Sequence, residues 1–463
     1  MKIKSIKLNT LILLIALYST NSFSAPKPNV LFIAIDDLGV ELNCYGQKEA
    51  QTPHIDRLAS QGILFEKAFC NIPTCGASRA SLMTSIYPTK NRFKSFSTKV
   101  DKDTPGAVTL PQVFRENGYK TLSRGKVFHH PRDCEGQSWS EPAWRPEIPS
   151  RYWLDPDSTK ILSKGAARGL IYERPRVDDL AYADGQIATK VIQDLRESKD
   201  KDQPFFIACG FVKPHLPFCA PQKYWEKYDQ ASLMIAKNRY RPQNAPPALK
   251  GSSEFRKYYL GGLKPKSEEF HRIMVHGYRA CVSYIDQLVG NILLALNELN
   301  LERNTIVVLW GDHGFHLGQH DFWGKHNTLL HSIQIPFIMK IPGINPARSE
   351  SLIETVDIFP TLCDIVGIEK PKQIQGISFK KTLNDPQYAP REHIYSRFKS
   401  GQVILNPPFS YTHYQDGSSL FFNHQDDPGE NINLAQKPEY TTLIEKMKQK
   451  LDLALQKADA AKW

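Results

Sequence analysis

The chain has 463 residues, of which 41% are hydrophobic, 11% aromatic and 23% charged, a composition typical of a large globular protein. Its formal net charge of +11 favours acidic partners, although a solvated cationic surface without a role is the simpler explanation. No RRM, zinc-finger or helix-turn-helix pattern occurs, so we expect no nucleic-acid partner. The eight cysteines include no CxxC pair, which argues against a disulfide scaffold or a structural zinc site but allows one or two disulfides.

The first 24 residues have the pattern of a secretory signal peptide. Lys2, Lys4 and Lys7 precede an apolar run at residues 11–18, and residues 22–24 supply small side chains for cleavage. The run is much shorter than the roughly 20 residues that cross a bilayer. We therefore expect an exported chain, periplasmic or secreted, without stable membrane insertion.

Apolar runs alternate with helical patterns over most of the remaining chain. Three runs read as strands buried on both faces, at residues 29–35, 204–211 and 304–310. Helical patterns predict helices at residues 52–62, 109–118 and 284–300. The alternation predicts an α/β fold in which helices sandwich a large, mostly parallel sheet.

Residues 132–174 and 221–265 are rich in Pro, Trp, Arg and Ser and lack clear periodicity. Irregular segments of this length are unusual in a compact domain unless they form a binding site. Short strand-like pieces and a charged helix at about residues 440–457 then predict a small α+β subdomain. We therefore divide the chain into a signal peptide (residues 1–24), a main domain (residues 25–390) and a C-terminal subdomain (residues 391–463).

Acidic residues follow two of the predicted strands. Asp36 and Asp37 come after the first, and Asp312 and His313 come after the third, at the strand ends where open α/β sheets bind ligands. Neighbouring carboxylates resist ionising together unless a cation lies between them. Three carboxylates and one imidazole suit Ca²⁺ or Mg²⁺ better than Zn²⁺. Taken singly, each pair is equally well explained as a helix cap or a surface turn.

The stretch NIPTCGASRASLMTS places Cys75 at the start of a predicted helix, close to Arg79. The helix dipole and the guanidinium would lower the pKa of a thiol there, so a thiolate nucleophile is one interpretation. A buried or disulfide-bonded structural cysteine is the alternative.

This stretch resembles the signature of the type I, formylglycine-dependent sulfatases of the alkaline-phosphatase superfamily, Cys-x-Pro/Ala-Ser-Arg followed by Leu-x-Thr-Gly. Ala77 stands where proline is commoner, and Ser85 stands where glycine is usual. The resemblance covers nearly the whole mature chain. The motifs KVFH and KPHLPF, together with His313, are most similar to the iduronate-2-sulfatase branch.

The resemblance implies that a formylglycine-generating maturation enzyme converts Cys75 to Cα-formylglycine, whose hydrate attacks the sulfur of a sulfate ester. It implies a divalent cation, Ca²⁺ with Mg²⁺ as the alternative, held by Asp36, Asp37, Asp312, His313 and the modified Cys75. The roles it implies for the other residues are neutralisation of the nucleophile by Arg79 and Lys126, contact of His129 with its second hydroxyl, and binding of sulfate by His215 and Lys325. The implied substrate is a sulfated carbohydrate, with 2-O-sulfated uronate as the specific expectation.

Two alternatives stay open. A phosphodiesterase or phosphonate monoester hydrolase of the same superfamily would use the same cations and nucleophile position. A non-catalytic protein that binds acidic glycans would leave Cys75 unmodified. Taken without the resemblance, Lys126 and Lys325 read as surface charges and His215 as a turn residue. We also expect His320 to help line the pocket.

Overall fold

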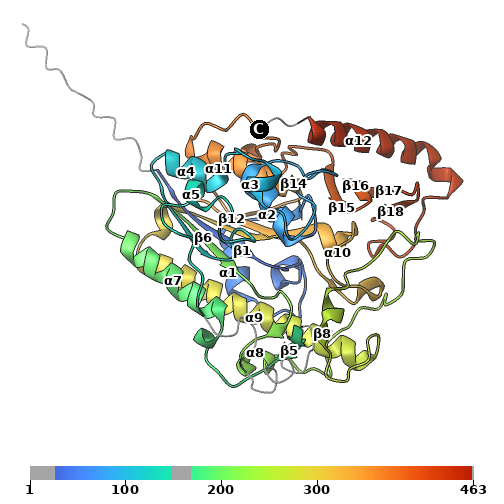
Figure 1. The fold of residues 1–463 in the computed structure, drawn as a ribbon, viewed down its shortest axis with the longest axis horizontal. Coiled ribbons are helices and arrows are strands. Elements are labelled where there is room, and N and C mark those ends of the chain that lie inside the picture. Colours follow the sequence, from blue (N-terminus) through green and yellow to red (C-terminus); the bar gives the residue numbers. More distant parts are fainter. Residues whose placement is uncertain (1–26, 148–153, 155–167, 461–463) are drawn as a thin grey trace, which may run out of the picture.

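The computed structural model describes residues 27–147, 154 and 168–460, so the predicted signal peptide lies outside the described residues (Figure 1). At its centre is an eight-stranded sheet with the order β13-β2-β12-β9-β1-β6-β3, in which β14 also pairs with β2. The strands are β1 (Asn29–Ile35), β2 (Ile63–Phe69), β3 (Lys120–Gly125), β6 (Phe205–Phe211), β9 (Thr305–Gly311), β12 (Gln334–Lys340), β13 (Ala347–Ser349) and β14 (Ile353–Glu354).

The sheet is mostly parallel, as predicted. β1 pairs in parallel with β6 and β9, and β3 pairs in parallel with β6, whereas β12 runs antiparallel to β9 and β2. The three apolar runs correspond to β1, β6 and β9, and every residue of these three strands is buried. Their lack of polar alternation therefore reflects burial on both faces.

Helices cover both faces of the sheet (Figure 1). One face packs against α1 (Pro53–Gln61), α7 (Ala183–Ser198) and α9 (Glu268–Glu298), and the other against α2 (Cys75–Thr84), α4 (Leu110–Glu116) and α11 (Ile358–Val366). Short helices lie in the connections: α3 (Val100–Asp103), α5 (Glu135–Ser138), α8 (Gln222–Trp225) and α10 (Leu330–Ile333). The predicted α/β sandwich is confirmed.

α9 begins 16 residues before the predicted start at residue 284. Its first half carries His271, His276 and Arg279, which break the apolar pattern in the sequence yet are buried in the fold. α9 is also long and apolar enough to cross a membrane, but 72% of its most apolar window is buried inside the protein. Its apolar surface therefore belongs to the core.

The C-terminal residues form the antiparallel sheet β15 (Ile394–Phe398), β16 (Gly401–Asn406), β17 (Phe409–Tyr414) and β18 (Ser419–Asn423), covered by α12 (Thr441–Asp459). The predicted strand pieces and terminal helix are present, and β16 was not predicted. Arg391 joins this part to the main sheet through ion pairs with Glu354 and Asp357. The boundary at residue 391 stays a prediction.

The two irregular segments meet in space. β4 (Arg168–Leu170) from the first pairs with β8 (Tyr258–Tyr259) from the second, and β5 (Tyr172–Glu173) pairs with β7 (Phe218–Cys219). A third short pair, β10 (His316–Leu317) with β11 (Trp323–Gly324), follows β9. These pairs hold long loops above the carboxyl ends of β1, β6 and β9.

Candidate active site

The carboxyl ends of β1 and β9 bring the two predicted acidic pairs together. Ile35 of β1 lies level with Gly311 of β9, so residues 36–37 and 312–313 leave the sheet at the same edge. Their side chains are fully buried. The backbone N–H of Asp37, which has the left-handed φ of 61°, donates a hydrogen bond of 3.0 Å to Asp312 Oδ1.

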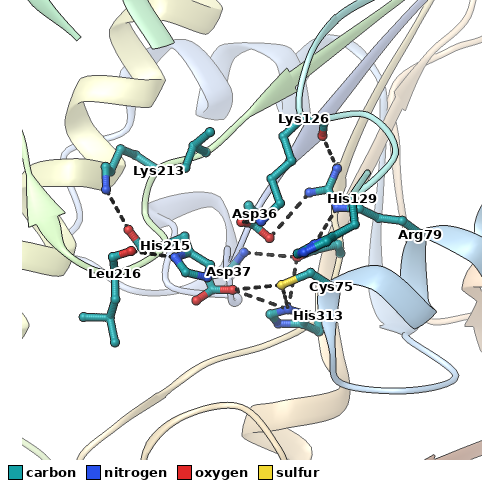
Figure 2. Close-up of polar contacts among 12 residues, drawn as sticks. Asp36, Asp37, Cys75, Arg79, Lys126, His129, Lys213, His215, Leu216 and His313 are labelled. Atoms are coloured by element: carbon teal, nitrogen blue, oxygen red, sulfur yellow. Dashed lines mark hydrogen bonds and ion pairs between the residues drawn. The ribbon is translucent and has the colours of Figure 1, made fainter. Parts of the chain in front are cut away.

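Cys75 reaches these residues from the first turn of α2. Its Sγ lies 3.3 Å from His313 Nε2 and 3.8 Å from Asp37 Oδ1 (Figure 2). Burial and the negative charge of Asp36 raise the pKa of the thiol well above its usual value. This direction is opposite to the lowered pKa expected from the sequence, because α2 is buried throughout and the nearest charges include carboxylates.

These residues fit a hard divalent cation. One ligand atom from each of Asp36, Asp37, Cys75 and His313 can be chosen so that all four lie within 4.8 Å of one another. Asp36 Oδ1 is buried and has no hydrogen-bond partner among the described residues. Asp312 lies beside this set, with Oδ1 3.5 Å from His313 Nε2. The three carboxylates supply the oxygen donors that Ca²⁺ and Mg²⁺ prefer.

Arg79 holds the carboxylates and the β3 loop in one network. Its Nε donates to Asp312 Oδ2 at 2.9 Å, and its Nη2 lies 3.6 Å from Asp36 Oδ1. Its Nη1 donates to the backbone carbonyls of Lys126 and Val127. The side chain is completely buried, so its charge is compensated by these partners and by the Trp310 ring, whose centroid lies 5.9 Å from Arg79 Cζ.

The two carboxyl groups beside Arg79 titrate differently. Burial opposes ionisation of Asp36, but Lys126, His215 and Arg79 hold its pKa well below the usual range. Burial raises the pKa of Asp312 to about 6, against the opposing effect of His313 and Arg79. A cation beside Asp312 would favour its ionised form.

Lys126 and His129 follow β3 at the same edge of the sheet. The Lys126 ammonium donates to Asp36 Oδ2. His129 lines the same cavity as Cys75, and its ring centroid lies 6.1 Å from that of Phe96. Burial and the neighbouring Lys126 lower the pKa of His129 to about 2. The imidazole is therefore neutral, and burial and the charge of Lys126 both oppose its protonation.

Lys325 and His215 are the remaining predicted site residues. Both contact Glu254, a residue that the sequence interpretation missed. Lys325 Nζ lies 2.6 Å from both carboxylate oxygens of Asp37 and 3.1 Å from Glu254 Oε2. His215 Nε2 lies 3.5 Å from Glu254 Oε1, and Arg168 Nη1 lies 3.4 Å from the same oxygen. Glu254 thus links three cationic or protonatable groups. The only sequence signal for it was its place within the irregular segment 221–265.

The site opens into a cavity of about 690 Å³, within the size range of ligand pockets. Cys75, Lys126, His129, His215 and Lys325 all line it. Both irregular segments contribute to its wall, through residues that include Arg145, Arg168, Glu254, Lys257 and Tyr258. Both segments thus line one cavity, and the expectation that they bind a ligand there stays a prediction.

His320 does not line the cavity, contrary to the sequence expectation. A left-handed turn after β10 directs it toward the Tyr240 carbonyl, 3.4 Å from its Nδ1. His326, to which no role was assigned, lines the cavity instead.

Glu254→Gln is expected to lower kcat/KM by about 10–100-fold, because Lys325 and His215 lose the carboxylate between them while side-chain volume is kept. Steady-state kinetics checks this, with Glu268→Gln as the control because Glu268 pairs with Arg272 on the exposed start of α9. Equal activity of the two variants would contradict a positioning role for Glu254.

Ser85 ends α2 in the left-handed conformation, with φ of 54°, which explains why glycine is usual at this signature position. Its hydroxyl donates to the Val356 carbonyl at 2.6 Å and accepts from the Gly376 N–H at 3.2 Å. These hydrogen bonds offset the conformational cost of a non-glycine residue. Ser85 thereby ties the end of α2 to the segments around α11.

Ser85→Ala is expected to lower the free energy of unfolding by about 1–3 kcal/mol, because it leaves the buried Val356 carbonyl and the partly buried Gly376 N–H unsatisfied and keeps the unfavourable φ. Ser85→Gly loses the same hydrogen bonds but removes the strain, so it should be about 1 kcal/mol more stable than the alanine variant. Urea denaturation measures both. If the alanine variant were as stable as the chain that keeps Ser85, the structural role of the hydroxyl would be refuted.

Family models match almost the whole chain. A model described as Sulfatase matches residues 28–368, and one described as N-sulphoglucosamine sulphohydrolase, C-terminal, matches residues 318–457. The chain belongs to the sulfatase family. The recognition made from the Cys75 signature is thereby confirmed, and the chain is an enzyme of the class that hydrolyses sulfate esters.

Two curated relatives and one solved structure are similar to this sulfatase over most of its length. It is 31% identical over 396 residues to iduronate 2-sulfatase of Mus musculus, which covers 77% of this chain and 71% of the relative. It is 27% identical over 464 residues to the Delta 4,5-hexuronate-2-O-sulfatase of Bacteroides thetaiotaomicron, with 95% and 91% covered. The phosphonate monoester hydrolase of Agrobacterium radiobacter has the same fold, with a TM-score of 0.76, 23% identity and coverage of 93% and 95%.

Proposed function

We propose that this sulfatase removes sulfate from a sulfated carbohydrate, with 2-O-sulfated uronate as the favoured substrate, by means of a Cα-formylglycine hydrate formed from Cys75. The observation that carries this proposal is the convergence of Cys75, Lys126, His129, His215 and Lys325 on one cavity. Both curated relatives described above are named for 2-sulfatase activity, on iduronate and on hexuronate. The +11 net charge of the chain is consistent with an acidic substrate.

The cationic residues would bind the sulfate group. Lys126 and Lys325 are held at the cavity floor by Asp36 and Asp37, so their charges lie where a sulfate would approach Cys75. His215 and Lys325 lie at the same wall, where they would hold the sulfate and assist the departing sugar oxygen. His129 would take a proton from the nucleophile once an anionic sulfate bound beside Lys126 offsets the positive charge that opposes its protonation. The hydrated aldehyde supplies an oxygen nucleophile and a second hydroxyl through which sulfate can leave.

The cation we propose is Ca²⁺, held by Asp36, Asp37, Asp312, His313 and the modified Cys75. When bound, it supplies positive charge that stabilises the nucleophile and the sulfate oxygens. The buried carboxylates around Arg79 keep the ligands in place, because both Asp36 and Asp312 pair with that guanidinium.

Chelation with EDTA is expected to abolish activity, and Ca²⁺ is expected to restore it more completely than Mg²⁺. Removal of the ion should also lower the melting temperature, because three buried carboxylates would lose a counter-charge. Activity assays and thermal denaturation before and after metal addition test both effects. Full activity in a chelated, metal-free sample would exclude the cation site.

We also propose that the chain is exported to the periplasm or secreted, and that a formylglycine-generating enzyme matures it. The signal-peptide pattern at residues 1–24 supports export. The Cys75 signature supports the modification.

The test of this function combines two measurements on protein from its native host. Mass spectrometry of the peptide containing Cys75 should show formylglycine, and only unmodified cysteine in active protein would refute the mechanism. Turnover should then be compared on a 2-O-sulfated uronate oligosaccharide, an aryl sulfate and an aryl phosphate diester. Cleavage of the diester without sulfate release would favour a phosphodiesterase, and tight glycan binding without any product would favour a binding protein.

A further inference from the structure

A second cavity, of about 330 Å³, adjoins the active-site cavity. Ser253 and His326 line both, so the two spaces share a wall. On its other side the second cavity is bounded by residues of the C-terminal sheet, including Phe398, Lys399 and Tyr414. A substrate that fills the active site and extends past His326 would therefore contact the C-terminal sheet.

The chemistry of this second cavity suits an acidic sugar. Lys250 and Lys399 are exposed at its rim, and the hydroxyls of Ser252 and Thr328 belong to its wall. Its one carboxylate, Asp416, already accepts hydrogen bonds from the N–H and hydroxyl of Ser418, at 3.0 and 2.6 Å. Lys250 and Lys399 thus offer positive charge to a ligand with carboxylate or sulfate groups, whereas the hydroxyls of Ser252 and Thr328 already pair with His326 and Thr412.

The ring of His326, which lines both cavities, is held in place by stacking and hydrogen bonding. The rings of His326 and Phe398 stack with centroids 5.1 Å apart and an interplanar angle of 13°. His326 Nδ1 also makes a 2.9 Å hydrogen bond with Ser252 Oγ. His326 adopts a φ of 83°, a conformation that bulky residues rarely take and that often marks functional sites. Lys399 Nζ lies 5.6 Å from the centroid of Phe398, so the same ring also orders the ammonium group.

We propose that this second cavity is a binding subsite for an acidic sugar residue further along the saccharide chain, with Lys250 and Lys399 as its specificity-determining cations. The volume, at the lower end of that of ligand pockets, matches a single sugar unit rather than a longer segment. The inference rests on the proposed glycan sulfatase function and adds that the C-terminal sheet selects oligosaccharides over small sulfate esters.

The test compares a sulfated tetrasaccharide of the heparin type with 4-nitrophenyl sulfate as substrates of the Lys250→Ala/Lys399→Ala double variant. The double variant should raise KM for the tetrasaccharide by roughly 10-fold and leave kcat/KM for the aryl sulfate unchanged. Its KM for the tetrasaccharide should also depend less on salt concentration, because two screened charges are gone. Lys448→Ala is the matched control, since Lys448 is exposed on α12 and lines neither cavity.

An equal loss on both substrates, or a double variant indistinguishable from Lys448→Ala, would overturn the subsite. Failure of the proposed function gives a different result: the protein without any substitution turns over no sulfate ester. In that case calorimetric binding of the tetrasaccharide still decides the subsite. Weaker binding by the double variant than by Lys448→Ala supports it, and equal binding refutes it.

Discussion

Cys75→Ala is expected to abolish sulfate release, with kcat lower by about 10⁴-fold or more, because it removes the only side chain from which the proposed nucleophile can form. The side chain is 3% exposed at the first turn of α2, where alanine fits without a clash. The fold and the binding of sulfated oligosaccharide should therefore persist. Single-turnover and steady-state assays, together with circular dichroism, measure the loss and check the fold.

Cys44→Ala is the matched control for this variant. Cys44 is a partly buried free thiol that lies outside the active-site cavity. Its removal should leave kcat within about twofold of the value for the chain that keeps Cys44, as expected for substitutions away from functional features. A Cys75→Ala protein that keeps more than about a tenth of the activity would show that another group acts as the nucleophile.

Arg79→Met is expected to lower the free energy of unfolding by about 3–5 kcal/mol, since it leaves Asp36 and Asp312 buried without their guanidinium partner. Activity should fall as well, because Arg79 Nη1 holds the carbonyls of Lys126 and Val127 and so positions the loop with Lys126 and His129. The urea midpoint and kcat/KM report the two effects separately.

The matched control is Arg303→Met, at an exposed arginine before β9. It should change stability by no more than about 0.5 kcal/mol. If Arg79→Met were as stable as Arg303→Met, the guanidinium would not be needed to compensate the two buried carboxylates, and Lys126 together with the proposed cation would carry that role.

Much of the fold and the site could be predicted from the sequence, because buried parallel strands have an unmistakable pattern. Residues 29–35 and 304–310 are continuous apolar runs, and each ends in polar residues, so the position of the carboxylates followed from the strand ends alone. β16 was missed although its residues are mostly buried, because the preceding residues Lys399 and Ser400 gave no clear turn signal.

Contacts between distant segments could not be predicted. Glu254 lies in an irregular stretch, and its partners Lys325 and His215 come from other parts of the chain. The pKa of Cys75 was misjudged for a related reason, since its local neighbours in sequence suggested a stabilised anion. The carboxylates that reverse this effect arrive from β1 and β9.

The position of β1 in the middle of the sheet also sets the order of events during folding. Asn29 of β1 contacts Phe205 and Thr305, which follow it by 176 and 276 residues. Closing such long loops is slow compared with local helix formation, so the sheet forms only after its distant strands are available. Until β9 joins β1, the segment around Cys75 lacks the walls that later enclose it. If Cys75 is converted as proposed, the modifying enzyme would reach it more readily before this enclosure than after it.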